Sequence, residues 1–225
     1  MDKRFFQYIH QFLKVSEKYV VSQIPKCGCS TVTLQSALYN FPEKNYSMDL
    51  FSDAEDKHLN TTDIGKKYFN TDSLFSLTRP FHINESNVKY YKNQKVVVIF
   101  RDPLERFISA CNTFKILGHL KDPFEKCLFI KNKLQRGLTI NNHFNPQHIY
   151  YDFDDVDIFV SLENYPKFCY DENIPWMKAN KNNSKKYLEY VPTQELINEI
   201  KDLYKEDYEL IEKIYKSNKL YKPLE

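Results

Sequence analysis

A lysine, a glycine and two hydroxyl side chains follow one another near the start of the chain, in the segment Pro25-Lys26-Cys27-Gly28-Cys29-Ser30-Thr31. The lysine adds a positive charge, the glycine lets the backbone approach a ligand closely, and the serine and threonine add hydroxyl donors. At the start of a helix, unpaired backbone N–H groups and the positive end of the helix dipole point the same way. The segment therefore predicts an anion site, most naturally one for phosphate.

The flanking residues predict a strand before this segment and a helix after it. Tyr19–Ile24 is short and rich in aromatic and β-branched residues, which is typical of a strand. From Val32 onward apolar residues recur at helical spacing, and Pro42 ends that pattern because the residue before a proline avoids the α region. The segment is not a Walker A loop, since Lys26 precedes the glycine. An ordinary strand-to-helix turn, with Lys26 in solvent and Ser30 as the helix N-cap, is the alternative.

A second segment with chemical potential begins at Arg101. Lys95–Phe100 is an apolar run typical of a central parallel strand that is buried on both faces. Asp102 suits a helix N-cap, and the proline and glutamate that follow it suit the first turn. Arg101 therefore closes a strand just before a helix.

The helix after Arg101 carries Ser109 on its polar face, together with Asp102, Glu105 and Arg106. Open α/β sheets bind ligands at the carboxyl edge of their strands, and there Arg101 and Ser109 can converge. The alternative is a well-capped helix with a solvated arginine and serine.

The remaining patterns predict a single α/β domain over residues 1–225, with a central, mainly parallel sheet flanked by helices. Residues 43–73 predict a polar surface excursion, and residues 177–189 a basic, mobile loop. The expected elements are an amphipathic helix in 3–14, a strand in 74–79, a helix in 121–135, a strand in 156–161, and one or two closing helices from residue 193. The helix in 3–14 is expected to pack on the domain or, alternatively, to contact a membrane or a partner.

Composition excludes several classes of protein. The net charge is only +2, from 32 basic and 30 acidic residues, which does not favour a nucleic-acid binder. The five cysteines form no regular framework, so we expect reduced thiols and a cytoplasmic protein. The pair Cys27 and Cys29 lacks the second pair that a zinc site needs, and we expect no metal site. No stretch is long and apolar enough to predict a transmembrane segment.

Two segments together resemble a known family. Val98–Ala110 closely resembles the 3′-phosphate motif of carbohydrate (Golgi-type) sulfotransferases, and the Lys26 segment resembles the 5′-phosphosulfate loop of sulfotransferases that use PAPS. His143–Gln147 is similar to the family's His-Trp-x-Pro-Gln segment, with Phe144 in place of the tryptophan. Val156–Asn164 and the later stretch Leu203–Tyr208 are also similar to segments of the family, and all of these segments come in the family's order.

The resemblance implies a P-loop-like three-layer sandwich and sulfuryl transfer from PAPS, with PAP as the product, to a hydroxyl of a carbohydrate or glycan. It implies that the segment Pro25, Lys26, Cys27, Gly28, Cys29, Ser30 and Thr31 binds the 5′-phosphosulfate. It also implies that Arg101 and Ser109 hold the 3′-phosphate, and that Lys26 is catalytic. The alternatives are a nucleotide-dependent kinase of a small molecule, which would need a Walker lysine and a magnesium-binding carboxylate, and an inactive nucleotide-binding regulator.

The acceptor hydroxyl needs a general base near neutral pH, and histidine is the natural choice. We predict His82, because it follows the expected strand in 74–79 at the same sheet edge, and the resembled family often places a base there. His143 and His58 are the next candidates. A surface or packing histidine is the alternative for His82.

Overall fold

The computed structural model describes residues 12–41, 64, 66–67, 71, 78, 93–113, 122–136, 138, 141–176 and 191–223. Within these residues one four-stranded sheet lies at the centre, in the order β1-β2-β3-β4. The strands are β1 (Phe12–Lys14), β2 (Tyr19–Ser22), β3 (Lys95–Phe100) and β4 (Ile158–Ser161). β1 is antiparallel to β2, whereas β2, β3 and β4 are mutually parallel. This confirms the predicted mainly parallel sheet.

The central strand β3 has the predicted bounds and the predicted burial. Val97, Val98 and Ile99 have no exposed surface, as expected of a strand with neighbours on both sides and helices over its faces. Val97 pairs with Val21 of β2 and with Ile158 of β4, which fixes the register of all three strands. The carboxyl ends of these strands therefore lie at one edge of the sheet.

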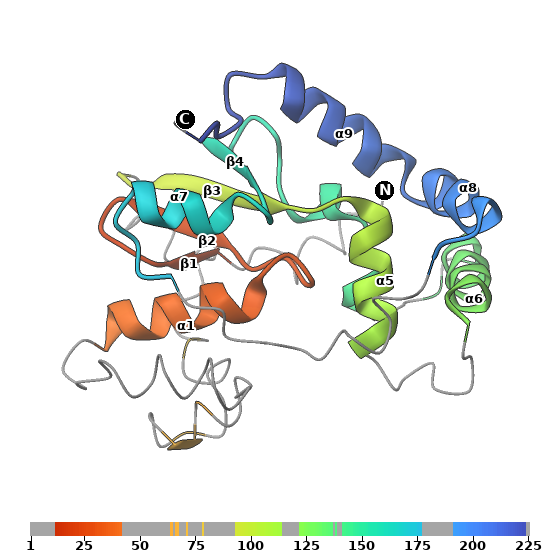
Figure 1. Ribbon diagram of the computed structural model, residues 1–225, viewed down its shortest axis with the longest axis horizontal. Helices are drawn as coiled ribbons and strands as arrows, with labels where there is room; N and C mark the ends of the chain where they lie inside the picture. Colours follow the sequence, from red (N-terminus) through yellow and green to blue (C-terminus); the bar gives the residue numbers. More distant parts are fainter. Residues whose placement is uncertain are drawn as a thin grey trace.

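Helices flank the sheet, with α1 and α9 on opposite sides of it (Figure 1). A second group of helices lies beyond the end of the sheet where β3 runs into α5 (Figure 1). The α-helices are α1 (Cys29–Asn40), α5 (Pro103–Thr113), α6 (Pro123–Gln135), α7 (Tyr165–Asp171), α8 (Gln194–Leu203) and α9 (Lys205–Lys216). Two short 3₁₀ helices, η5 (Asn142–Phe144) and η6 (Gln147–Tyr150), lie in the described segment between α6 and β4.

In the part of the chain that the structure describes, the buried apolar residues form two clusters. The larger cluster surrounds the sheet, and the smaller one lies between α5, α6, α8 and η5. In the smaller cluster Phe107 contacts the rings of Phe144 and Tyr204, with centroids 5.6 and 6.3 Å apart. η5 is thus anchored by Phe144, which is 2% exposed at the position where the resembled segment has tryptophan.

Two sequence predictions are wrong where the structure describes them. The helix predicted in 3–14 is a strand from Phe12 to Lys14, because Leu13 pairs with Val21 and is fully buried while its two neighbours are only partly buried. The rest of that segment lies outside the described residues. In the strand predicted at 74–79, the described residue Thr78 is helical and fully buried. The two loops predicted at 43–73 and 177–189 lie almost wholly outside the described residues.

Among the described residues, no helix combines the length and the apolar character that crossing a membrane requires. The closing helices were predicted as one or two, and the structure has two, α8 and α9. Thr193 caps α8, since its hydroxyl oxygen accepts the Leu196 N–H at 3.2 Å.

Candidate functional site

The turn after β2 has an unusual backbone at Lys26. Both Lys26 and Gly28 lie in the left-handed region, with φ of 67° and 82°. For a lysine this conformation is strained, and such strain is often found at ligand-binding positions. The Cys27 N–H donates to the Ile24 carbonyl at 3.0 Å and closes the turn. Helix α1 begins at Cys29, three residues before the Val32 that the sequence pattern indicates.

Gly28 is required for two physical reasons. Its φ favours glycine, and a Cβ placed there would lie 3.1 Å from Leu162 Cδ1. Gly28 is also the N-cap of α1, so it supplies no side-chain oxygen to the first turn, and that turn carries no acidic residue. The positive end of α1 is therefore uncompensated by α1's own side chains, as an anion site requires.

The second predicted segment begins with the expected cap. The Glu105 N–H donates to Asp102 Oδ1 at 3.0 Å, which confirms Asp102 as the N-cap of α5. Arg101 follows β3 directly, and its Nε contacts Glu105 Oε2 at 3.2 Å. Ser109 is half-buried in the same helix. It lies six residues after the first residue of α5, Pro103.

Arg106 is a site residue that the sequence analysis misses. The sequence assigns it to the polar face of α5, but it is only 2% exposed. Its Nε donates to the Pro25 carbonyl at 3.0 Å and its Nη1 to the Asn145 carbonyl at 2.6 Å. Nothing in the periodicity predicts this, because arginine is rarely buried and its partners are two distant backbone carbonyls.

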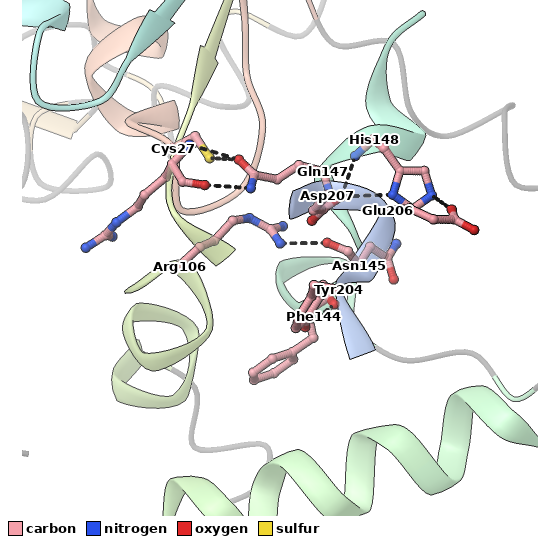
Figure 2. A network of polar contacts seen from close by, with 10 residues as sticks. Cys27, Arg106, Phe144, Asn145, Gln147, His148, Tyr204, Glu206 and Asp207 are labelled. Atoms are coloured by element: carbon pink, nitrogen blue, oxygen red, sulfur yellow. Dashed lines mark hydrogen bonds and ion pairs between the residues drawn. The ribbon is translucent and has the colours of Figure 1, made fainter. Parts of the chain in front are cut away.

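The phosphate-type loop and the Arg101 segment meet at Gln147. Its Oε1 accepts from the Cys27 thiol at 3.2 Å and from the Arg101 N–H at 3.0 Å. Figure 2 shows this amide bonded to Cys27, and Arg106 bonded to Asn145 nearby. The structure therefore brings together the two segments that the sequence analysis singles out.

The charges at this meeting point are mainly positive. Burial lowers the pKa of Lys26 below its usual value, and the like charges of Arg101 and Arg106 lower it further, although the two loop cysteines act against this. Burial also lowers the pKa of His143 to about 4, helped by Lys26 and Arg106. A buried lysine whose surroundings disfavour its charge gains from an anionic ligand, because the anion offsets the neighbouring positive charges.

The histidines divide into three groups. His82, the predicted base, lies outside the described residues, as do His58, His10 and His119. His143 is half-buried beside Lys26 and Arg106, and its Nδ1 lies 2.7 Å from Asn141 Oδ1. His148 contacts Glu206 and Asp207 at 2.6 and 2.8 Å.

The thiols of the loop differ in their surroundings. Cys27 is fully buried, and burial raises the pKa of its thiol to about 11, so it acts as a neutral donor to Gln147. Cys29 is partly exposed at the start of α1. All five cysteines are free, as the sequence analysis expects.

Comparison of the sequence with models of known families gives one match. The sequence matches the model of the sulfotransferase family over residues 10–155, which is more than half of the 225 residues and includes both segments of the site. The chain belongs to the sulfotransferase family. No curated protein and no solved structure matches the chain. Membership in the sulfotransferase family supports a transferase that moves sulfuryl groups, and the mixed sheet flanked by helices fits that fold.

Proposed function

We propose that this sulfotransferase moves a sulfuryl group from PAPS to a hydroxyl of a carbohydrate or glycan. The observation that carries the proposal is the meeting of two cationic segments at one atom, Gln147 Oε1. PAPS has two phosphate-bearing ends, and a site for it needs a cationic group for each of them. Lys26 and Arg101 supply these groups from neighbouring parallel strands.

The phosphosulfate end is assigned to the β2–α1 turn. Lys26, the first-turn N–H groups of α1 and the hydroxyls of Ser30 and Thr31 would hold it, with Pro25, Cys27, Gly28 and Cys29 forming the turn. Sulfuryl transfer resembles phosphoryl transfer, in which attack is in line and negative charge moves onto the leaving group. The protein therefore has to position the donor and stabilise charge on the bridging oxygen.

The 3′-phosphate is assigned to Arg101 and Ser109. The Arg101 backbone is held on both sides by Gln147, whose Nε2 also donates to the Arg101 carbonyl at 2.7 Å. Because the Arg101 backbone is already fixed, its guanidinium can bind a phosphate without a further loss of backbone freedom. This contact distinguishes PAPS from nucleotides that lack a 3′-phosphate.

The acceptor proton needs a base, for which two histidines compete. His82 is proposed from the resemblance, although Thr78 is helical, which removes the sheet-edge argument for it. His143 is the alternative, because it lies beside Lys26 and Arg106. Because an amide oxygen only accepts, the His143 Nδ1–H donates to Asn141 Oδ1, which leaves the lone pair of the neutral ring on Nε2.

The carbohydrate acceptor is proposed from the resemblance of Val98–Ala110 to carbohydrate sulfotransferases. A kinase is not favoured, because its loop places the lysine after the glycines and Lys26 precedes Gly28. An inactive regulator would keep the donor site and lack the general base. Loss of turnover on replacement of His82 or His143 would distinguish an enzyme from such a regulator.

Replacing Arg101 by alanine tests the donor assignment at the level of binding. We expect the affinity for PAP to fall at least about tenfold, since a hydrogen bond to a charged group is worth about 1.5–3 kcal/mol. The affinity for AMP, which lacks the 3′-phosphate, should change little. Isothermal titration of both nucleotides with the wild-type and variant proteins measures the difference.

Ser109→Ala provides the matched comparison for Arg101→Ala. If both side chains contact one phosphate, the double variant should lose less PAP affinity than the two single losses predict together. Equal losses for PAP and AMP in Arg101→Ala would contradict the assignment of the 3′-phosphate to this residue.

A further inference from the structure

The proposed function assigns the segment His143–Gln147 no direct contact with the donor, yet this segment contains the residue where the two donor segments meet. Gln147 is 1% exposed and lies at the start of η6. Its amide bonds to residues 120 and 46 positions away, Cys27 and Arg101. A buried amide is costly when it lacks hydrogen-bond partners, and the partners that satisfy this one lie in two distant segments of the chain.

The amide of Gln147 holds Arg101 as a neighbouring strand would. It accepts the Arg101 N–H at 3.0 Å and donates to the Arg101 carbonyl at 2.7 Å. The Cys27 thiol donates to the same acceptor oxygen at 3.2 Å. One side chain therefore fixes the backbone of Arg101 and the residue next to Lys26.

Gln147 is itself fixed by the start of α9. The Gln147 N–H donates to Asp207 Oδ2 at 2.7 Å, and the His148 N–H donates to Asp207 Oδ1 at 2.9 Å (Figure 2). Asp207 is 1% exposed, and a buried carboxylate gives strong hydrogen bonds. His148 lies between Asp207 and Glu206, which adds an ion pair to this support when the ring is protonated.

Arg106 makes a second tie between the same two segments. It joins the Pro25 carbonyl to the Asn145 carbonyl, at 3.0 and 2.6 Å. Its Nη2 is buried and has no partner among the described residues, so the guanidinium is oriented by these two carbonyls. With one tie at Pro25 and another at Cys27, the turn that carries Lys26 is held on both sides.

We propose that Gln147 is a positioning residue that sets the separation of Lys26 and Arg101, so that the two phosphate-bearing ends of the donor bind as a unit. The inference rests on the proposed function and extends it to a residue without any contact to the reacting atoms. When the two segments are held in place, they bind both ends of one ligand without a cost in free energy for ordering either segment. When one segment is mobile, its ordering on binding costs free energy, and the affinity for a ligand that contacts both segments falls.

The test compares PAP with AMP, because AMP engages only the Lys26 segment. In Gln147→Leu we expect the affinity for PAP to fall about tenfold and the affinity for AMP to change much less. The preference for PAP, that is the ratio of the two affinities, therefore falls. Asp207→Asn weakens the hydrogen bond that supports the Gln147 backbone but leaves the Gln147 side chain in place. We expect it to lower the preference for PAP too, by a smaller factor. It also keeps the test usable if Gln147→Leu fails to fold. Titration calorimetry gives both affinities.

Gln35→Leu is the matched control. Gln35 is also a buried amide, 3% exposed, and it also joins distant segments. It accepts from the Tyr165 hydroxyl at 2.6 Å and donates to the Pro175 carbonyl at 2.8 Å. We expect this variant to lower the Tm as Gln147→Leu does and to leave the preference for PAP unchanged.

The outcomes separate this inference from the proposed function. If the wild-type protein binds PAP no better than AMP, the donor assignment fails, and the role of Gln147 fails with it. If the wild-type protein prefers PAP and Gln147→Leu keeps that preference, only the positioning role is overturned. If Gln35→Leu lowers the preference for PAP as much as Gln147→Leu does, the effect comes from a general loss of stability. That result would also overturn the positioning role of Gln147.

Discussion

Lys26→Ala is expected to lower the turnover of sulfuryl transfer by ~10²–10³, the usual effect of losing one group that stabilises transition-state charge. The reason is the position of Lys26 in a strained turn at the start of α1, next to the cations Arg101 and Arg106. Its environment lowers its pKa, so the folded protein disfavours the charge that the donor needs. We therefore expect the variant to be at least as stable as the wild type.

Lys14→Ala is the control for this change. Lys14 is also partly buried, with 20% of its side chain exposed, but it lies in β1 and contacts Glu17 at 3.1 Å. It should retain wild-type turnover. Steady-state rates at saturating donor, together with thermal unfolding, separate a catalytic loss from an unfolding one. Near-normal turnover in Lys26→Ala would remove Lys26 from the mechanism.

Loss of the general base is expected to have the other large effect. We expect His82→Ala to lower turnover by ~10²–10⁴ while PAP affinity stays almost unchanged, because the base acts on the acceptor and not on the donor. His143→Ala is the matched comparison. If His143 only borders the donor site, its replacement should leave turnover within a few-fold of the wild type.

The pH dependence distinguishes the two histidines. A base works when unprotonated, so kcat/KM falls as the pH drops through the pKa of the base in the free enzyme. With His82 as the base, this fall should lie near the ordinary histidine value of about 6.5. With His143 it should lie near its lowered pKa of about 4. A loss of turnover confined to His143→Ala, with the fall near the lower value, would move the base to His143.

For His143 the acid limb of kcat carries further information. A bound anionic donor offsets the charges of Lys26 and Arg106, two of the causes that lower its pKa. The fall in kcat, which reports the enzyme–substrate complex, should then occur at higher pH than the fall in kcat/KM. His82 carries no such expectation.

The elements that sequence analysis predicts well are those with strong local signals. The residues Val96–Phe100 are all apolar, and β3 has the predicted bounds Lys95–Phe100. Asp102 is followed by a proline and a glutamate at the spacing of a helix start, and it caps α5 as expected. In both cases the residues that decide the structure are neighbours in the chain.

The elements that it misses depend on contacts between distant residues. Phe12–Lys14 becomes a strand because it pairs with β2, a partner that helical periodicity does not reveal. Arg106 looks like a surface residue of an amphipathic helix, and only the carbonyls of Pro25 and Asn145 make its burial favourable. The resemblance includes Gln147 in a motif, but the hydrogen bonds of Gln147 to Cys27 and Arg101 become apparent only in the fold.

The cytoplasmic location stays a prediction.

Transfer of label from the donor tests the central claim most directly. The wild-type protein is incubated with a panel of glycans and either PAPS labelled in its sulfuryl group or ATP labelled in its γ-phosphate, with Lys26→Ala in parallel. We predict that label passes from PAPS to a glycan hydroxyl, that Lys26→Ala loses most of this transfer, and that ATP gives none. Label passing from ATP, with none from PAPS, would contradict the account.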